Sequence, residues 1–248
     1  MSLQPPPMTA VMKGLRFEQR SLRLLREHLS MSLRRVGGKG DGGIDLQGWW
    51  WLPAECLGYR VSFGRPPAPF RGRLRVVAQC KAEEKKIGPR YIREFEGTIL
   101  RHSGRLSPRD DSQSQTGSLS VRDALVGLFL STSPFTKSSL LQAYSSPIPL
   151  ALLHLPEPSV SEVQADATLP AQSSADTSTG VDIALPGTLL FNPALGGSTG
   201  ILRGMVEPRW ERSTTSSEGH PGIWMNGTRI TSWTPEDHLG GGDPAQTP

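Results

Sequence analysis

Four residues in the first third of the chain have the types and the spacing that hydrolysis of a phosphodiester requires. Asp45 stands at the head of one predicted strand, and Gln79 and Lys81 stand two residues apart on the next. Residues two apart on a strand project from the same face, so the Gln79 amide and the Lys81 ammonium are expected side by side. Glu18, in the first predicted helix, adds a second carboxylate. Glu18, Asp45, Gln79 and Lys81 are therefore the candidate catalytic residues.

This reaction needs a hard divalent cation, a water activated by that cation and positive charge near the phosphate. The candidate metal ligands are oxygens of Asp45, Glu18 and Gln79 and the backbone carbonyl of Cys80, a set suited to Mg²⁺ or Mn²⁺. Lys81 would orient the water and offset developing charge. Each residue also has an ordinary reading, because an Asp after glycines forms turns and a Gln-x-Lys on a strand commonly faces solvent.

The position of Glu18 is informative because it lies on an apolar stripe. Residues 14–33 are predicted to form a helix whose leucines recur at spacings of three and four, with Glu18 four residues before the first of them (Leu22, Leu25, Leu29 and Leu33). A carboxylate on a core-facing stripe is costly unless it is paired or binds a metal. The alternative is a first-turn glutamate, which is common near a helix N-terminus.

The segment Val36–Gly48 approaches the next strand through a run of glycines. It predicts a tight, irregular turn followed by a strand at about residues 44–48. It is not a phosphate-binding loop, because no Gly-Lys-Ser/Thr and no helix follow. Asp41 within it is read as a turn residue in preference to an accessory metal ligand.

The remaining pattern alternates strands and helices. Strand 74–81 would form a hairpin with strand 44–48 through a long connection, and an apolar run at 124–130 is typical of a strand buried on both faces. The later elements are a helix at 89–101, a helix at 134–144 and a strand at 148–155. This βαβ order predicts an α/β fold with a mixed central sheet flanked by helices.

Composition divides the chain. Apolar residues make up 36% of it, and Gly (27) and Pro (22) are abundant. We expect one domain at 13–155 with insertions at about 52–73 and 103–120, a disordered linker at 156–180, and an extension at 181–248 that is partly docked or disordered. No run of about 18 apolar residues is present, so no membrane span is expected. Two cysteines without a zinc pattern suggest a reducing interior.

Positive charge is concentrated in the first half. Residues 1–110 carry 21 Lys or Arg against 10 Asp or Glu, whereas residues 111–248 carry 6 against 13. This bias favours a polyanionic partner such as DNA, with Lys39, Arg90 and Arg93 as candidate phosphate contacts. The alternative is a solvated basic surface.

Three motifs resemble one nuclease family. Gly14-Leu-Arg-Phe-Glu18, the Gly-Asp-Gly-Gly-Ile-Asp-Leu run within 37–48, and Val77-Ala-Gln-Cys-Lys81 are similar to the Mrr-like branch of the PD-(D/E)XK nucleases, and the closest similarity is to the fungal mitochondrial "required for respiratory growth" family with an Mrr-like domain. Residues 127–136 and 148–153 resemble the later βαβ unit of that branch. The resemblance covers about residues 13–155.

The resemblance implies a restriction-endonuclease-like αβββαβ-type core. Asp45 would be the metal-binding aspartate, Gln79 would occupy the position of the second acidic residue, Lys81 would be the motif lysine and Glu18 the helix carboxylate. It implies an Mg²⁺-dependent or Mn²⁺-dependent endodeoxyribonuclease of the type IV, Mrr-like kind, acting on DNA in mitochondria. The first twelve residues are too short and proline-rich for a recognisable presequence.

Two departures from the family pattern bear on substrate access: the connection from Asp45 to Gln79 is longer than in compact bacterial members, and residues 103–120 are inserted. Glutamine in place of an acid at position 79 also removes one negative charge and leaves a second function open. The alternative is a catalytically weak or inactive nuclease-fold protein that binds DNA and supports mitochondrial genome maintenance or respiratory growth.

Overall fold

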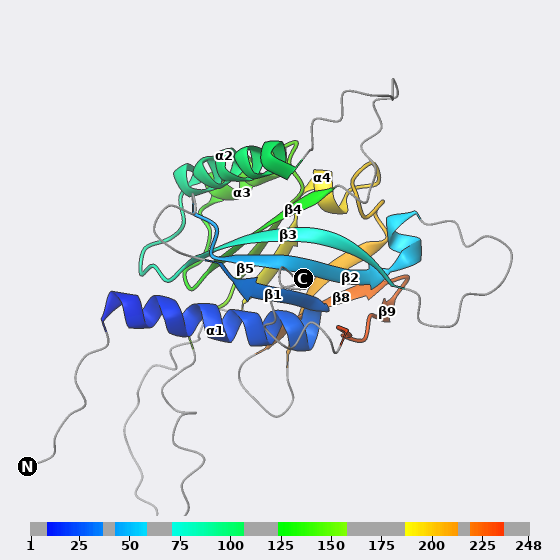
Figure 1. The fold of residues 1–248 in the computed structure, drawn as a ribbon, viewed down its shortest axis with the longest axis horizontal. Helices are drawn as coiled ribbons and strands as arrows, with labels where there is room; N and C mark the ends of the chain where they lie inside the picture. The colour runs from blue at the N-terminus through cyan, green and yellow to red at the C-terminus, as the bar shows by residue number, and fades with distance from the viewer. Residues whose placement is uncertain are drawn as a thin grey trace, which may run out of the picture.

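The computed structural model describes residues 9–36, 43–58, 71–106, 124–157, 187–212 and 219–235. Within them, six strands form one sheet in sequence order (Figure 1): β1 (Met31–Arg35), β2 (Leu46–Pro53), β3 (Arg71–Lys81), β4 (Leu125–Ser131), β5 (Leu150–His154) and β6 (Thr188–Phe191). The first three strands are antiparallel, β3, β4 and β5 are parallel, and β6 returns antiparallel to β5. The predicted mixed α/β fold is confirmed.

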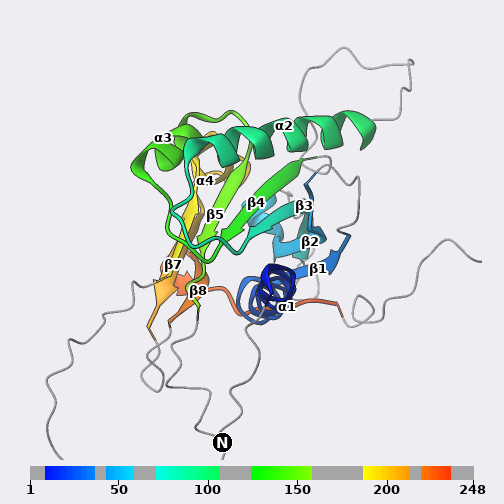
Figure 2. The same ribbon diagram turned by 90° about the vertical axis from the view of Figure 1, so that its left-hand side faces the viewer.

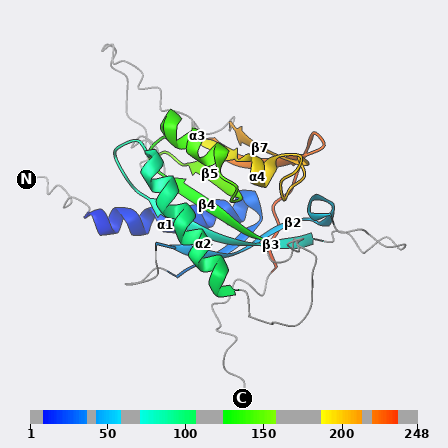
Figure 3. The same ribbon diagram turned by 90° about the horizontal axis from the view of Figure 1, so that it is seen from above.

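Helices cover both faces of this sheet (Figure 2). The helices α2 (Pro89–Leu106) and α3 (Lys137–Ser145) lie on one face, and α1 (Ala10–Leu29) lies on the other. Each of α2 and α3 connects two parallel neighbouring strands, and both crossovers step across the sheet in the same direction. Since such crossovers are right-handed, the two helices must share a face. Seen from above, α2 runs across the middle of the sheet (Figure 3).

The expected helix through residue 33 is wrong. α1 ends at Leu29, and Ser30 takes a left-handed backbone conformation with φ 57°. The chain then reverses into β1, where Met31 pairs with Trp50 and Leu33 with Gly48. The leucine spacing continues past Leu29, but alternation from residue 31 suits a strand equally well, and pairing with β2 decides between them.

The core has two layers, one on each side of the sheet. On the α1 side, Leu25 and Leu29 pack against Trp50 and Leu74. On the α2 side, Phe95 and Ile99 pack against other sheet residues that include Val77 and Phe129. All seven residues of β4 are buried, as its apolar run predicts.

The sequence predicted that the domain ends at residue 155. The sheet nevertheless includes β6, which pairs with β5 at its edge. Short helical elements occur at η1 (Ala54–Leu57) and α4 (Pro193–Gly196). A second sheet of β7 (Val206–Glu211), β8 (His220–Met225) and β9 (Thr228–Arg229) lies beside α1, so part of the extension is docked.

Several sequence-based expectations fall outside the described residues: residues 158–180 of the predicted linker, residues 59–70 of the first insertion and residues 107–120 of the second. Residues 103–106 instead continue α2, and residues 71–73 belong to β3. In the described part of the chain, no helix combines the length and the apolar character needed to cross a bilayer.

Candidate active site at the end of β3

Asp45, the residue before β2, is fixed by hydrogen bonds between the end of β1 and β3. Its backbone N–H donates to the carbonyl of Ala78, and its own carbonyl accepts from the N–H of Val36, both at 2.9 Å. Its carboxylate Oδ2 accepts from the backbone N–H of Cys80 at 2.7 Å. Hydrogen bonds to an ionised acceptor are the stronger ones. The carboxylate is therefore held against the residue that separates Gln79 from Lys81.

The Cys80 thiol marks the place where the charged candidates converge. Burial raises its pKa well above the ordinary value, and the negative charges of Asp45 and Glu18 raise it further. Arg35 and Lys81 act in the opposite direction. All four side chains are therefore near enough to the end of β3 to act on the thiol electrostatically. With its pKa raised, the thiol stays protonated and is neither a nucleophile nor a thiolate ligand.

Glu18 has a charged partner, as its position on the apolar stripe of α1 requires. Its Oε2 lies 2.5 Å from Nε of Arg35, the last residue of β1. The Glu18 side chain is 18% exposed and that of Arg35 is 48% exposed. The turn from α1 into β1 creates this pair, because it brings the end of the strand back alongside the helix.

Gln79 lines a pocket on the α2 side of the sheet. The pocket has a volume of about 510 Å³ and is lined by Gly43, Gln79 and residues of α2 (Arg93, Glu94, Gly97, Thr98 and Arg101). A side chain at Gly43 would meet Nε2 of Gln79 at 3.0 Å, and φ at this glycine is +91°. Glycine therefore allows the chain before β2 to pass over Gln79.

Lys81 lies on the same face of β3 as Gln79 and is half-buried. Its Nζ is 6.0 Å from the ring centroid of Tyr91 at the start of α2. No carboxylate in the described part of the chain lies within ion-pair distance of it. Glu18 has Arg35 as its partner instead, so Lys81 is not the structural counter-charge that a buried ion pair would require.

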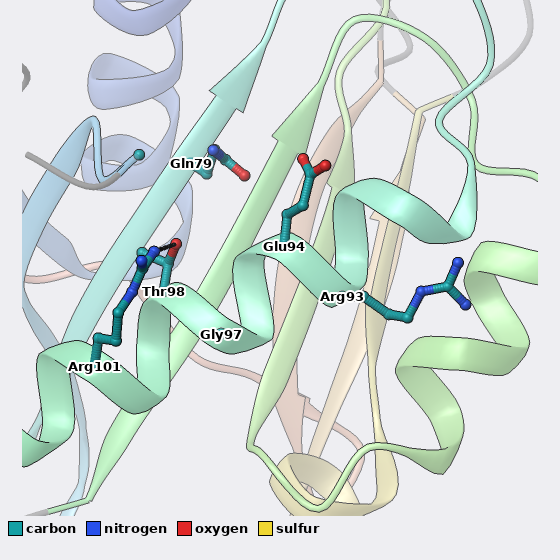
Figure 4. A pocket seen from close by; sticks show the side chains of 7 residues that line it. Gln79, Arg93, Glu94, Gly97, Thr98 and Arg101 are labelled. Carbon is teal, nitrogen blue, oxygen red and sulfur yellow. Dashed lines mark hydrogen bonds between the residues drawn. The ribbon is translucent and has the colours of Figure 1, made fainter.

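The candidate phosphate contacts differ in their surroundings. Arg90 is exposed, lies 3.6 Å from Glu94 and stacks over Tyr91. Arg93 lines the pocket, but Figure 4 shows its guanidinium pointing away from Gln79. Lys39 and Asp41 lie outside the described residues.

The oxygen donors at this site are of the kind that Mg²⁺ or Mn²⁺ binds: two carboxylates, one amide and one backbone carbonyl. Among the described residues, no three His, Cys, Asp or Glu side chains gather closely enough to hold a metal by themselves. An ion here would therefore rely on the Gln79 amide and the Cys80 carbonyl besides Asp45. Glu18 would join only after leaving Arg35.

Arg35, Thr98 and Arg101 were not found from the sequence. Arg101 Nη2 donates to Thr98 Oγ1 at 3.2 Å beside Gln79 (Figure 4). One signal was available for α2, since Arg93, Gly97 and Arg101 recur every fourth residue and so share a face of the helix. The role of Arg35 depends on the reversal after Leu29, which the helical pattern concealed.

The fold and this site define a mixed α/β protein with a polar, partly charged centre at the carboxyl end of a central strand. A model of the family Required for respiratory growth protein 7 matches residues 9–179, more than half of the chain, and the chain belongs to this family. No solved structure matches it.

Relatives with the same family description come from fungi. The protein Required for respiratory growth protein 7, mitochondrial, of Saccharomyces cerevisiae is 31% identical over 128 residues, which cover 39% of this chain and 52% of the relative. That of Zygosaccharomyces rouxii is 28% identical over 171 residues, 59% of this chain and 65% of the relative.

An uncharacterized mitochondrial protein of Schizosaccharomyces pombe is 31% identical over 156 residues, 62% of this chain and 49% of that protein. The chain thus spans about half the length of the fission yeast and baker's yeast relatives. These relatives are mitochondrial proteins, and the expected mitochondrial localisation is confirmed.

Proposed function

We propose that this chain is a metal-dependent endonuclease with an Mrr-like PD-(D/E)XK site that hydrolyses DNA in mitochondria. One observation carries the proposal: the Cys80 N–H holds the Asp45 carboxylate between Gln79 and Lys81 of β3, and the Glu18 carboxylate is near enough to raise the pKa of the Cys80 thiol. Three separate elements contribute these groups. A purely structural arrangement would not need a lysine without a carboxylate partner at this place.

The residues of the chain divide the work as follows. The Cys80 N–H orients the Asp45 carboxylate, and Asp45 with the Gln79 amide supplies the oxygens that hold the cation. When bound, Mg²⁺ or Mn²⁺ lowers the pKa of a water and offsets charge on the phosphate. The Lys81 ammonium donates to a phosphate oxygen and stabilises the charge that develops there. Arg101 beside Gln79 contacts the neighbouring phosphate.

A second candidate function is supported by a different observation. Glu18 is paired with Arg35, and Gln79 carries no charge, so this set offers a cation less negative charge than a site with an acid at both strand positions. A weak metal site would make the chain a nuclease-fold protein that binds DNA with little or no cleavage.

Plasmid nicking separates the two functions. Asp45→Asn removes the charge but keeps an oxygen that can accept from Cys80, so it should fold normally and lose metal-dependent cleavage. Glu55→Gln, at an exposed residue of η1, is the matched control. Cleavage by the wild type with Mg²⁺ or Mn²⁺, abolished by chelator and by Asp45→Asn, supports the endonuclease. DNA binding without cleavage in either ion supports the second function, and cleavage that persists in chelator contradicts the proposed site.

A further inference from the structure

Tryptophan and arginine side chains cluster on a part of the sheet that the candidate active site does not use. Arg73 Cζ lies 4.2 Å from the ring centroid of Trp49, and Arg75 Cζ lies 5.5 Å from it. Trp49 on β2 is directly opposite Arg75 on β3 and Ser32 on β1. We call Trp49, Arg73 and Arg75, with Gln47 and Arg34 beside them, the Trp49 face.

The strand register places this face on the α2 side of the sheet. Gln47 is paired with Val77, which packs in the core layer beneath α2, and Trp49 is two residues from Gln47. Directly opposite residues and residues two apart share a face. Trp50, on the reverse side, is fully buried, whereas Arg34 and Arg73 are exposed and Trp49 is half-buried. This part of the sheet is therefore buried on the α1 side and accessible to solvent on the α2 side.

The charge of the Trp49 face is not compensated within the described part of the chain. None of the carboxylates there lies within ion-pair distance of Arg34, Arg73 or Arg75. A second pair of this kind is found on β8, where Cζ of Arg209 lies 4.4 Å from the ring centroid of Trp224.

In that second pair the charges are matched. Glu207 pairs with Arg209 at 2.8 Å, and the indole Nε1 of Trp224 donates to Glu211. The same aromatic and cationic partners therefore occur twice, once neutralised by acids and once, at the Trp49 face, without them.

We infer that the Trp49 face binds a single-stranded segment of nucleic acid. An aromatic ring accepts a base by stacking whatever the base sequence, and flanking arginines bind the phosphates on either side. Arg73 and Arg75 stand two residues apart on one strand with both guanidinium groups near the same ring, so each can meet one of two neighbouring phosphates. A peptide or a lipid surface would not need an indole in contact with two cations.

The Trp49 face is also placed to serve the candidate active site. Arg75 and Gln79 are on the same strand, and four residues of strand correspond to about 13 Å. A strand held at Trp49 could therefore extend to Lys81 within a few nucleotides. The inference rests on the proposed function for the class of polymer, a nucleic acid, and does not require that the chain cleave it.

The test measures binding of three fluorescent ligands by anisotropy: fifteen-nucleotide oligo(dT), fifteen-nucleotide oligo(rU) and a duplex of the same length. EDTA is present so that no metal-dependent cleavage occurs. Trp49→Ala should weaken binding of the single strands about tenfold. Trp49→Phe should keep most of it, because a ring remains. Trp224→Ala is the matched control and should bind as the wild type does. Melting temperatures of all variants establish that they are folded.

The arginines give an independent readout. The double variant Arg73→Gln/Arg75→Gln should reduce the slope of log affinity against log salt by about 1.4, since each phosphate contact on a single strand contributes about 0.7. Unchanged affinity in folded Trp49→Ala, equal losses on the duplex, or equal binding of polyglutamate would each overturn the inference. Binding that depends on Trp49, in a protein that does not cleave DNA, would support this inference and contradict only the proposed endonuclease activity.

Discussion

At the scale of single residues, the candidate site depends on where one hydrogen-bond ladder stops. The register between β2 and β3 begins at Leu46 opposite Ala78, so β2 offers no further strand residue to the end of β3. The Cys80 N–H therefore donates to the Asp45 carboxylate, where a longer β2 would have offered a backbone carbonyl. An aspartate directly before a strand can thus reach across to its neighbour. This local exchange fixes the Asp45 carboxylate beside Gln79 and Lys81.

Lys81→Ala tests catalysis against folding at this scale. Loss of one electrostatic contact to the transition state costs on the order of 3 kcal/mol, about a hundredfold in cleavage rate. Stability should change little, because Lys81 forms no ion pair with a described carboxylate. Cleavage and melting temperature are measured together, with the exposed Lys86→Ala as control. A strongly lowered melting temperature would show that Lys81 holds the fold.

At the scale of elements, the sequence predicted what short-range pattern controls. The hairpin of β2 and β3, the two βαβ units and the buried β4 follow from alternation and apolar runs. The end of α1 does not, because residues 29–33 suit a helix and a strand alike. β6 and the second sheet were also missed as strands. β6 has only four residues, and its stability comes from pairing with a distant strand, as Leu152 opposite Leu190 shows.

The candidate site divides in the same way. Asp45, Gln79 and Lys81 lie on adjacent strands, so spacing along the chain was enough to bring them together. Arg35 reaches Glu18 only through the reversal at Ser30. Arg101 reaches Gln79 only through the packing of α2 over β3, which no local pattern specifies.

Two glycines test how α2 meets the sheet. A Cβ at Gly97, within α2, would meet nothing within 4 Å, so Gly97→Ala should stabilise the protein by about 0.5–1 kcal/mol. A Cβ at Gly127 on β4 would lie 2.8 Å from Leu150 Cδ2 and closer still to Ile99 Cδ1, so Gly127→Ala should destabilise by about 1–3 kcal/mol. Urea unfolding measures both. Equal effects of the two changes would mean that α2 does not pack on β4 in this way.

At the scale of the whole molecule, the last described segments secure the first helix. The rings of His28 on α1 and His220 on β8 stack with centroids 4.2 Å apart. The Ser232 hydroxyl donates to the carbonyl of Arg26, and the Trp233 N–H donates to Ser30 Oγ at 3.1 Å. The second sheet and the segment that follows β9 thus hold the end of α1, the helix that also presents Glu18. Loss of these contacts would therefore allow α1 to move, and with it Glu18 at the candidate site.

The His28–His220 stack predicts that docking of the second sheet weakens in acid. Burial lowers the pKa of His28, and the charges of His220 and Arg229 lower it further, against the opposing effects of Glu27 and Glu211. A pKa below 6.5 in the docked state means that the undocked histidine binds the proton more readily. The contribution is therefore complete above pH 6.5 and is lost as the pH falls through the lowered pKa.

Hydrogen exchange of α1 and β8, corrected for intrinsic rates, should become faster between pH 7.5 and pH 5 in the wild type. His28→Phe keeps a stacked ring that cannot be protonated, so its protection should change less over this range. His102→Gln, on α2, retains His28 and should behave as the wild type. Glu211, whose pKa is lowered by Arg229 and Trp224 against the effect of burial, adds a further loss below its ordinary value of 4.5. If wild type and His28→Phe lose protection in parallel, the stacked imidazoles are not the groups that make docking depend on pH.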